Sequence, residues 1–149
     1  MRGSLPFYAL SLVLLPAVFC GAARGADETA VAHVEALYAG EWPGKDARYS
    51  ARILALWEAC ESRPDAEEEP CLDFDFFVMA QDYDLTDFKL EPLSDDGRIA
   101  RVKASFVNLG RPTEVVFDLV HDGDGWTIDE MTSGCETLSG VLKREPPAC

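Results

Sequence analysis

The segment between residues 72 and 84 holds the side chains most able to do chemistry. Carboxylates and one amide are interspersed there among aromatic residues, and the polar members are Asp73, Asp75, Gln81, Asp82 and Asp84. Burial among aromatic rings raises the pKa of a carboxyl, which would suit it to general acid–base catalysis or to a ligand pocket. Converging carboxylates could instead bind a hard cation such as Ca²⁺. The favoured interpretation is that these side chains cap backbone groups of an irregular segment, and no metal site is expected.

Three further side chains would join a pocket if the fold brings them together. His33 and Tyr38 lie on a predicted first helix, and Trp57 lies on a predicted second helix. Neither His33 nor His121 belongs to a nucleophile motif, and the sequence has no glycine-rich phosphate loop. Aromatic residues on helices build a core more often than a ligand site. These residues are therefore candidate ligand-binding residues only, no catalytic residue is assigned, and no cofactor is expected.

The composition limits the classes of partner. The chain has 149 residues, of which 27 are acidic and 13 basic, so its formal net charge is −14, and 48% of its residues are hydrophobic. The apolar fraction excludes a wholly disordered chain. Nucleic acid and anionic membrane surfaces are not expected as partners, because both require clusters of Lys and Arg that the sequence lacks.

Residues 1–25 have the layout of a secretory signal peptide. Arg2 is followed by an apolar run over residues 5–19 and then by small residues suited to a signal peptidase. The run is short for a membrane span and no second one follows, so no span is expected after cleavage. Lipidation at Cys20 is disfavoured because Phe19 occupies the position where a lipobox has a small residue. Cleavage would remove Arg2 and Arg24 and leave a mature domain, residues 26–149, with a net charge of −16.

The cysteines that remain after cleavage indicate a periplasmic or secreted protein. They are Cys60, Cys71, Cys135 and Cys149. An even number of cysteines in an exported chain predicts two disulfides, for which three pairings exist. The local pairing, Cys60 with Cys71 and Cys135 with Cys149, is favoured because short loops close at the lowest entropic cost. Metal binding is the alternative, and no Cys-x-x-Cys spacing supports it.

The hydrophobic pattern predicts a single α+β domain. Apolar residues recur at helical spacing over residues 27–38 and again after Ser50, which resembles an N-cap. From Leu85 the period changes to two, and turns are predicted at residues 95–97, 108–112 and 122–125. This order predicts N-terminal helices packed on a curved, four-stranded antiparallel meander sheet. Lys89, Arg101 and Lys103 are expected to pair with acidic residues on its polar face.

Several short strings, taken in order, resemble those of one known family. They are Tyr49-Ser50-Ala51-Arg52-Ile53-Leu54, Leu72-Asp73-Phe74-Asp75, Ala80-Gln81-Asp82-Tyr83-Asp84-Leu85, Ala104-Ser105-Phe106-Val107-Asn108, Phe117-Asp118-Leu119-Val120 and Gly125-Trp126-Thr127-Ile128-Asp129. Over roughly residues 28–142 the chain resembles the exported bacterial family called domain of unknown function 3828. That family is similar to the nuclear transport factor two-like superfamily, which includes the SnoaL-like proteins. The resemblance implies a cone, in which a curved sheet wraps the helices and leaves a pocket at its mouth.

The resemblance implies no particular activity, because the superfamily contains both enzymes and binding modules. The favoured hypothesis is a non-enzymatic binding module for a small ligand or for an envelope protein. The second is a SnoaL-like hydrolase, isomerase or dehydratase that uses an Asp/His acid–base pair. The third is an acidic inhibitor or immunity-type protein, steered to a basic enzyme by its charge. A monomer and a homodimer are both compatible with the sequence.

Overall fold

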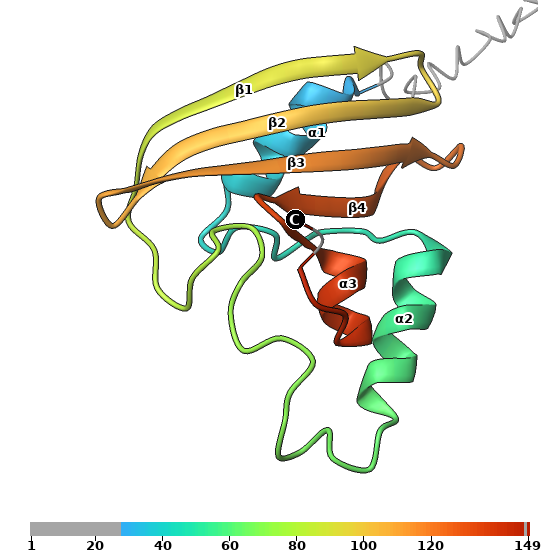
Figure 1. The fold of residues 1–149 in the computed structure, drawn as a ribbon. Coiled ribbons are helices and arrows are strands. Elements are labelled where there is room, and N and C mark those ends of the chain that lie inside the picture. The colour runs from blue at the N-terminus through green and yellow to red at the C-terminus, as the bar shows by residue number, and fades with distance from the viewer. Residues whose placement is uncertain (1–27, 148) are drawn as a thin grey trace, which may run out of the picture.

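The computed structural model describes residues 28–147 and 149, so the predicted signal peptide with Cys20 lies outside the described residues. The fold is α+β, as the hydrophobic pattern predicts (Figure 1). Its elements are α1 (Ala30–Tyr38), α2 (Ala51–Glu61), β1 (Leu85–Asp95), β2 (Ile99–Asn108), β3 (Arg111–His121), β4 (Trp126–Ser133), β5 (Glu136–Thr137) and α3 (Leu138–Lys143). The strands form one antiparallel sheet in the order β1-β2-β3-β4-β5.

The sheet has five strands, whereas the alternating pattern predicts four. The four predicted strands are present as β1 to β4, and the fifth, β5, is only two residues long. The helix α3, which follows it directly, was not predicted either. A two-residue strand and a six-residue helix are too short to produce a recognisable hydrophobic period. Both pack beside β4, where Leu138 and Leu142 of α3 are buried.

The turn between β2 and β3 is tighter than the predicted turn over residues 108–112. Leu109 and Gly110 have φ angles of 47° and 80°, which is the pattern of a two-residue type I′ hairpin. Arg111 and Pro112 therefore belong to β3, where Pro112 is the register partner of Val107. A type I′ turn favours Asn followed by Gly. Because Leu109 stands where Asn is preferred, the sequence lacks the pattern that would have predicted the position of this turn.

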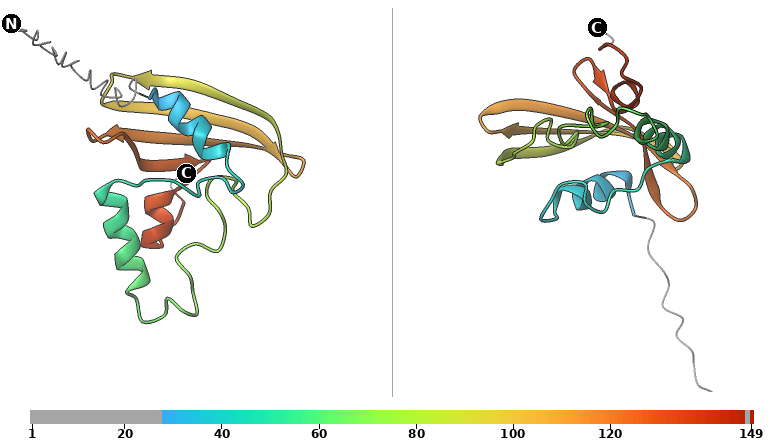
Figure 2. Two further views of the ribbon diagram at one scale, coloured as in Figure 1. Left: turned by 180° about the vertical axis from the view of Figure 1, so that it is seen from behind. Right: turned by 90° about the horizontal axis from the view of Figure 1, so that it is seen from below.

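One face of the sheet forms the core together with α1. Figure 2 shows α1 lying against the face that is turned away from the viewer in Figure 1. Alternate residues of β2 and β3 point to this side and are buried, and they meet a buried stripe on α1. The members are Ala100, Val102, Ala104, Phe106, Val115, Phe117, Leu119, Ala30, Val34 and Leu37. The apolar residues of the period-two pattern and those of the helical pattern are thus buried against each other in one interface.

The start of α2 is fixed to β4. The Ser50 hydroxyl accepts a hydrogen bond from the Ile53 N–H and donates one to Asp129 at 2.6 Å, so the predicted N-cap is confirmed. The Ser50 N–H donates to the carbonyl of Ile128, and the Ile128 N–H donates to the carbonyl of Arg48. Figure 1 shows α2 and α3 side by side next to β4.

The cysteines form the two local pairs that the sequence favours. Cys60 is bonded to Cys71, with their Cα atoms 5.9 Å apart. Cys135 is bonded to Cys149, with a Cα separation of 5.2 Å. The first bond joins the end of α2 to the segment that leads to β1, and the second joins the C-terminal tail to the turn after β4.

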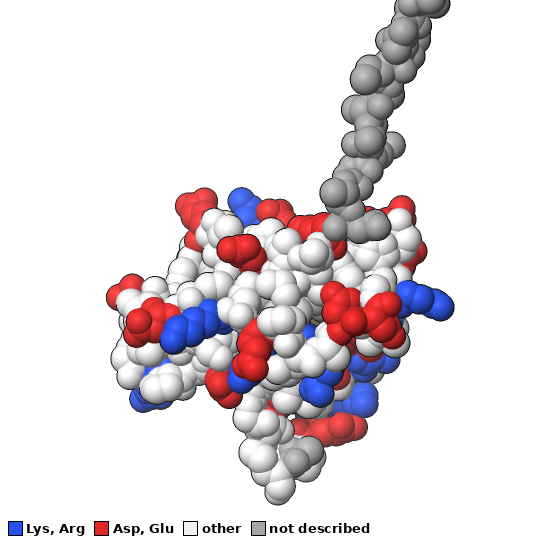
Figure 3. Space-filling model, turned by 90° about the horizontal axis from the view of Figure 1, so that it is seen from above, with Lys and Arg blue, Asp and Glu red and all other residues white. Residues whose placement is uncertain are grey.

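The other face of the sheet carries paired charges. Lys103 lies 2.8 Å from Glu91, and Arg101 lies 2.5 Å from Asp118, which are two of the expected cross-strand pairs. Figure 3, a view of the molecule from above, shows separate groups of Asp and Glu side chains on that surface with Lys and Arg side chains among them. None of the helices in the described part of the chain is long and apolar enough to cross a membrane.

Candidate functional site

The predicted polar residues of the segment between α2 and β1 do not gather in one cavity. The side chains of Asp73, Gln81 and Asp82 are exposed. The Gln81 amide donates to the backbone carbonyl of Asp73 at 2.9 Å and so bridges the segment. Residues 28–147 and 149 contain no group of three His, Cys, Asp or Glu side chains that could hold a metal ion.

Asp75 differs from its neighbours because it is partly buried. Its carboxylate accepts a hydrogen bond from the Phe77 N–H at 2.8 Å, and its own N–H donates to the carbonyl of Ala80 at 3.0 Å. These bonds close a tight turn, in which Met79 has a positive φ of 54°. Burial raises the pKa of the Asp75 carboxyl, while the bond from Phe77 acts in the opposite direction. The turn places three consecutive buried residues, Phe76 to Val78, in the core.

Two tyrosines lie close enough to Asp75 for its charge to contribute to their pKa values. Burial, with a smaller contribution from Asp75, raises the pKa of Tyr49 to about 12. The same two causes raise the pKa of Tyr38 well above its ordinary range. The Tyr38 hydroxyl donates to the Phe77 carbonyl at 2.9 Å. Both phenols are therefore neutral structural groups at physiological pH.

His33 and Trp57 occupy two other places. The Nδ1 atom of His33 lies 3.4 Å from a carboxylate oxygen of Glu28, near the start of α1, and its side chain is 12% exposed. Trp57 contacts the ring of Tyr49 and borders a groove of about 430 Å³ beside the Cys60–Cys71 disulfide. The predicted site residues thus lie in separate places: in the segment before β1, on α1 and on α2.

A different group of residues forms an apolar groove between the end of α1 and the start of β1. The groove has a volume of about 280 Å³ and is lined by Glu35, Tyr38, Ala39, Leu85 and Phe88. The ring centroid of Tyr38 lies 4.8 Å from that of Phe88. Of these lining residues, only Tyr38 was a predicted site residue.

A β-bulge creates this groove. Leu85 and Phe88 are three residues apart, so in a regular strand they would face opposite sides of the sheet. The register of β1 against β2 shifts between Thr86 and Lys89, and Asp87 there has a φ of 55°. The extra residue changes the phase of the strand, so that Leu85 and Phe88 both face α1. Alternation alone predicts a regular strand, and no local signal in the sequence marks the bulge.

One carboxylate lines the groove, and further carboxylates and aromatic rings lie near its lining residues in the sequence. Glu35 forms part of its wall, and Asp84 and Asp87 lie on either side of Leu85 on exposed positions. Trp42, which is 56% exposed, packs against Tyr83 with ring centroids 5.7 Å apart. An apolar groove with exposed aromatic faces and nearby carboxylates can bind a cation that has an apolar body. No family model, no curated protein and no solved structure matches this chain.

Proposed function

We propose that this protein is a binding module that works outside the cytoplasm, and that its groove between α1 and β1 is a non-enzymatic site that holds a small apolar cation. The observation that carries the proposal is the bulge at Asp87, which turns Leu85 and Phe88 to the same side. Phe88 then keeps 37% of its surface exposed in a groove walled by Glu35. A ligand that covered this ring would remove apolar surface from water.

The chemistry of the groove favours a cation over other small ligands. The Tyr38 hydroxyl already donates a hydrogen bond to the Phe77 carbonyl. A ligand in the groove would therefore contact the ring of Tyr38 and not its hydroxyl. The face of Phe88 attracts a positive charge through its quadrupole, and Glu35 supplies a full negative charge. An amine with an aryl or alkyl body meets both requirements, whereas an anion would be repelled.

The disulfides support the proposed compartment, and the family resemblance is compatible with a pocket at this place. Two disulfides are typical of proteins in the periplasm or outside the cell, in agreement with the predicted signal peptide. The proposed membership of the domain of unknown function 3828 family would make the sheet part of a nuclear transport factor two-like cone. The groove between the first helix and the first strand would then be the pocket at the mouth of that cone.

The acid–base alternative has less support from the geometry. Its best carboxylate, Asp75, already accepts a hydrogen bond from the Phe77 N–H, and His33 is paired with Glu28. The inhibitor alternative requires a surface patch of one sign, whereas Arg101 and Lys103 lie among the acidic residues of the sheet face. We therefore propose neither of these two alternatives.

A matched set of probes tests the binding module. 2-Phenylethylamine, 2-phenylethanol and phenylacetate have similar apolar bodies but carry a positive, zero and negative charge. At about 100 times its Kd a ligand stabilises the folded state by about 2.7 kcal/mol, which raises Tm by roughly 10 °C in a domain of this size. We expect the amine to raise Tm most and phenylacetate not at all.

Two variants and one control locate the site. Phe88→Ala and Glu35→Gln should abolish the shift caused by the amine, because they remove the ring and the charge of the groove. Leu93→Ala removes an exposed apolar side chain, 43% exposed, from the far end of the same strand and should leave the shift intact. The proposal fails if none of the three compounds shifts Tm, or if Phe88→Ala responds like the unmodified protein.

A further inference from the structure

The two sulfurs of the Cys60–Cys71 disulfide differ in their access to solvent. Cys60 is 2% exposed, on the buried side of α2. Cys71 is partly exposed and lines two surface grooves, one of about 430 Å³ with Trp57 and Leu72, and one of about 650 Å³ with Asp73. A thiol that approaches from solvent therefore meets Cys71 first.

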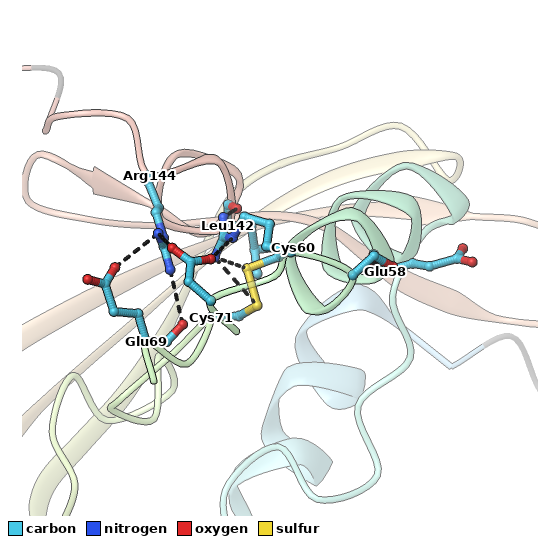
Figure 4. Close-up of a disulfide and its surroundings, with 9 residues drawn as sticks. Glu58, Cys60, Glu69, Cys71, Leu142 and Arg144 are labelled. Carbon is cyan, nitrogen blue, oxygen red and sulfur yellow. Dashed lines mark hydrogen bonds and ion pairs between the residues drawn. A yellow bond between two sulfur atoms is a disulfide. The ribbon is translucent and has the colours of Figure 1, made fainter. Parts of the chain in front are cut away.

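A guanidinium group lies against the buried sulfur. The Nη2 atom of Arg63 is 2.7 Å from the Sγ atom of Cys60 and 3.9 Å from that of Cys71. Its Nη1 atom donates to the carbonyl of Leu142 at 3.3 Å, which anchors the group to α3. Figure 4 shows the disulfide beside Leu142, with the side chain of Glu58 pointing away from the sulfurs. The nearest charge to Cys60 is thus positive and is held in place.

This arrangement favours one direction of thiol–disulfide exchange. When a thiolate attacks Cys71, Cys60 leaves as a thiolate, and exchange is faster when the leaving thiolate is stabilised. The carboxyl end of α2 opposes this with about half a unit of negative charge. The Nη2 atom of Arg63 is in direct contact with the sulfur, whereas the other charged partner of the guanidinium, the Asp65 carboxylate, lies 3.8 Å from its Nε atom, so Arg63 has the larger effect on Cys60.

We propose that the Cys60–Cys71 disulfide is an exchange site that oxidises a dithiol substrate. A substrate thiolate attacks the Sγ atom of Cys71, the S–S bond breaks, and the electron pair goes to Cys60 beside Arg63. The second substrate thiol, as its thiolate, then attacks the substrate sulfur of the mixed disulfide and releases Cys71 as a thiolate. The substrate ends as a disulfide, and this protein ends with two reduced cysteines.

The surroundings of Cys71 define the charge of the substrate. Glu61 and Glu67 line the smaller groove. The larger one is lined by one cation, Arg144, which is paired with Glu69, and by a surplus of carboxylates: Glu68, Glu69, Asp73 and Glu145. These carboxylates repel an anionic thiol such as glutathione and favour a neutral or cationic one. The substrate class is therefore a dithiol whose flanking groups are neutral or basic.

The reduced form keeps its cysteines near each other. Arg144 contacts the carboxylates of Asp65 and Glu69 at 2.7 and 2.9 Å and donates to the Glu69 carbonyl at 3.1 Å. These bonds hold the loop between Cys60 and Cys71 to the end of α3 without the disulfide (Figure 4). Exchange with an external disulfide, which is itself reduced to two thiols, then restores the Cys60–Cys71 bond.

Rapid acid quenching and peptide mapping test the proposal on the unmodified protein. The protein is mixed with 2-mercaptoethanol, cysteamine or glutathione, quenched and mapped for mixed disulfides. We expect the adduct on Cys71, and a higher rate for cysteamine than for glutathione after each is corrected for its thiolate fraction. An adduct mainly on Cys60, or equal corrected rates at low salt, would overturn the proposal.

The role of Arg63 is tested by a conservative pair of variants. Arg63→Gln should slow reduction of Cys60–Cys71 by dithiothreitol about tenfold, whereas Arg63→Lys should retain most of the rate because it keeps the charge. Reduction of Cys135–Cys149 in the same samples is the internal control and should not change. If Arg63→Gln leaves the rate unaltered, Arg63 has no part in exchange. Mapping of the unmodified protein decides the attack site even if a variant fails to fold.

Discussion

At the scale of single residues, Asp75 links the local turn to the pH dependence of stability. Burial raises its pKa above the ordinary value of 3.8, so the folded protein holds this proton more tightly than the unfolded chain. The resulting stability is fully present below the unfolded pKa and is lost as the pH rises through the folded pKa. Asp75→Asn should remove this dependence, because Asn is uncharged and still accepts the bond from Phe77.

Urea unfolding between about pH 4 and pH 7 measures this effect. Asp75→Asn should be at least as stable as the unmodified protein at pH 7. Asp75→Ala should be less stable by about 1 kcal/mol, since it leaves the Phe77 N–H without its acceptor. Asp73→Asn, at an exposed position, is the control and should behave like the unmodified protein. Equal losses for Asn and Ala at position 75 would show that the charge itself stabilises the turn.

Leu109 is a second residue whose conformation predicts an effect. It has a φ of 47°, and the left-handed conformation costs free energy for a residue with a side chain. Because Leu109 is 59% exposed, burial of its side chain does not offset that cost. Leu109→Asn should stabilise the protein by roughly 0.5–1 kcal/mol, because Asn followed by Gly is the preferred pair for this turn. The urea midpoint reports the change. Leu93→Asn, at an exposed position without a positive φ, is the comparison and should not stabilise.

At the scale of elements, the bulge in β1 controls both stability and the proposed ligand groove. Asp tolerates the left-handed conformation of position 87, Gly tolerates it better, and a β-branched residue does not. Asp87→Val should therefore cost roughly 1–2 kcal/mol in urea unfolding. It should also weaken binding of 2-phenylethylamine by displacing Phe88. Asp87→Gly should retain both properties, and the bulge would lose its assigned role if the two variants bound equally.

The same strand shows how far the sequence predicts this fold. Alternation predicts β1 to β4 and places Phe88 and Leu90 on one side, and Ser50 predicts the start of α2. Alternation cannot predict that Leu85 shares this side, because the bulge depends on the backbone of Asp87 and on pairing with β2. The polar residues around Asp75 are predicted as site residues from their residue types alone. The groove depends on a contact between Tyr38 and Phe88, which no local sequence pattern encodes.

At the scale of the whole molecule, the surplus of negative charge lowers the free energy of unfolding. The chain has 27 acidic and 13 basic residues, and several of the cations are held close to carboxylates, such as Lys103 between Glu91 and Glu114. Pairs of this kind on the surface contribute about 0.2–1 kcal/mol each. The surplus of negative charge repels itself across the whole domain, over distances comparable to the Debye length.

Salt should therefore stabilise this protein. Contacts such as Lys103–Glu91 at 2.8 Å are much shorter than the Debye length and lose little, whereas the repulsion between distant carboxylates is screened. Raising NaCl from about 10 mM to about 300 mM should increase the free energy of unfolding by about 1 kcal/mol in urea titrations. Lys103→Gln adds to the surplus and should be less stable with a steeper salt dependence. A fall in stability with salt would mean that the ion pairs outweigh the net repulsion.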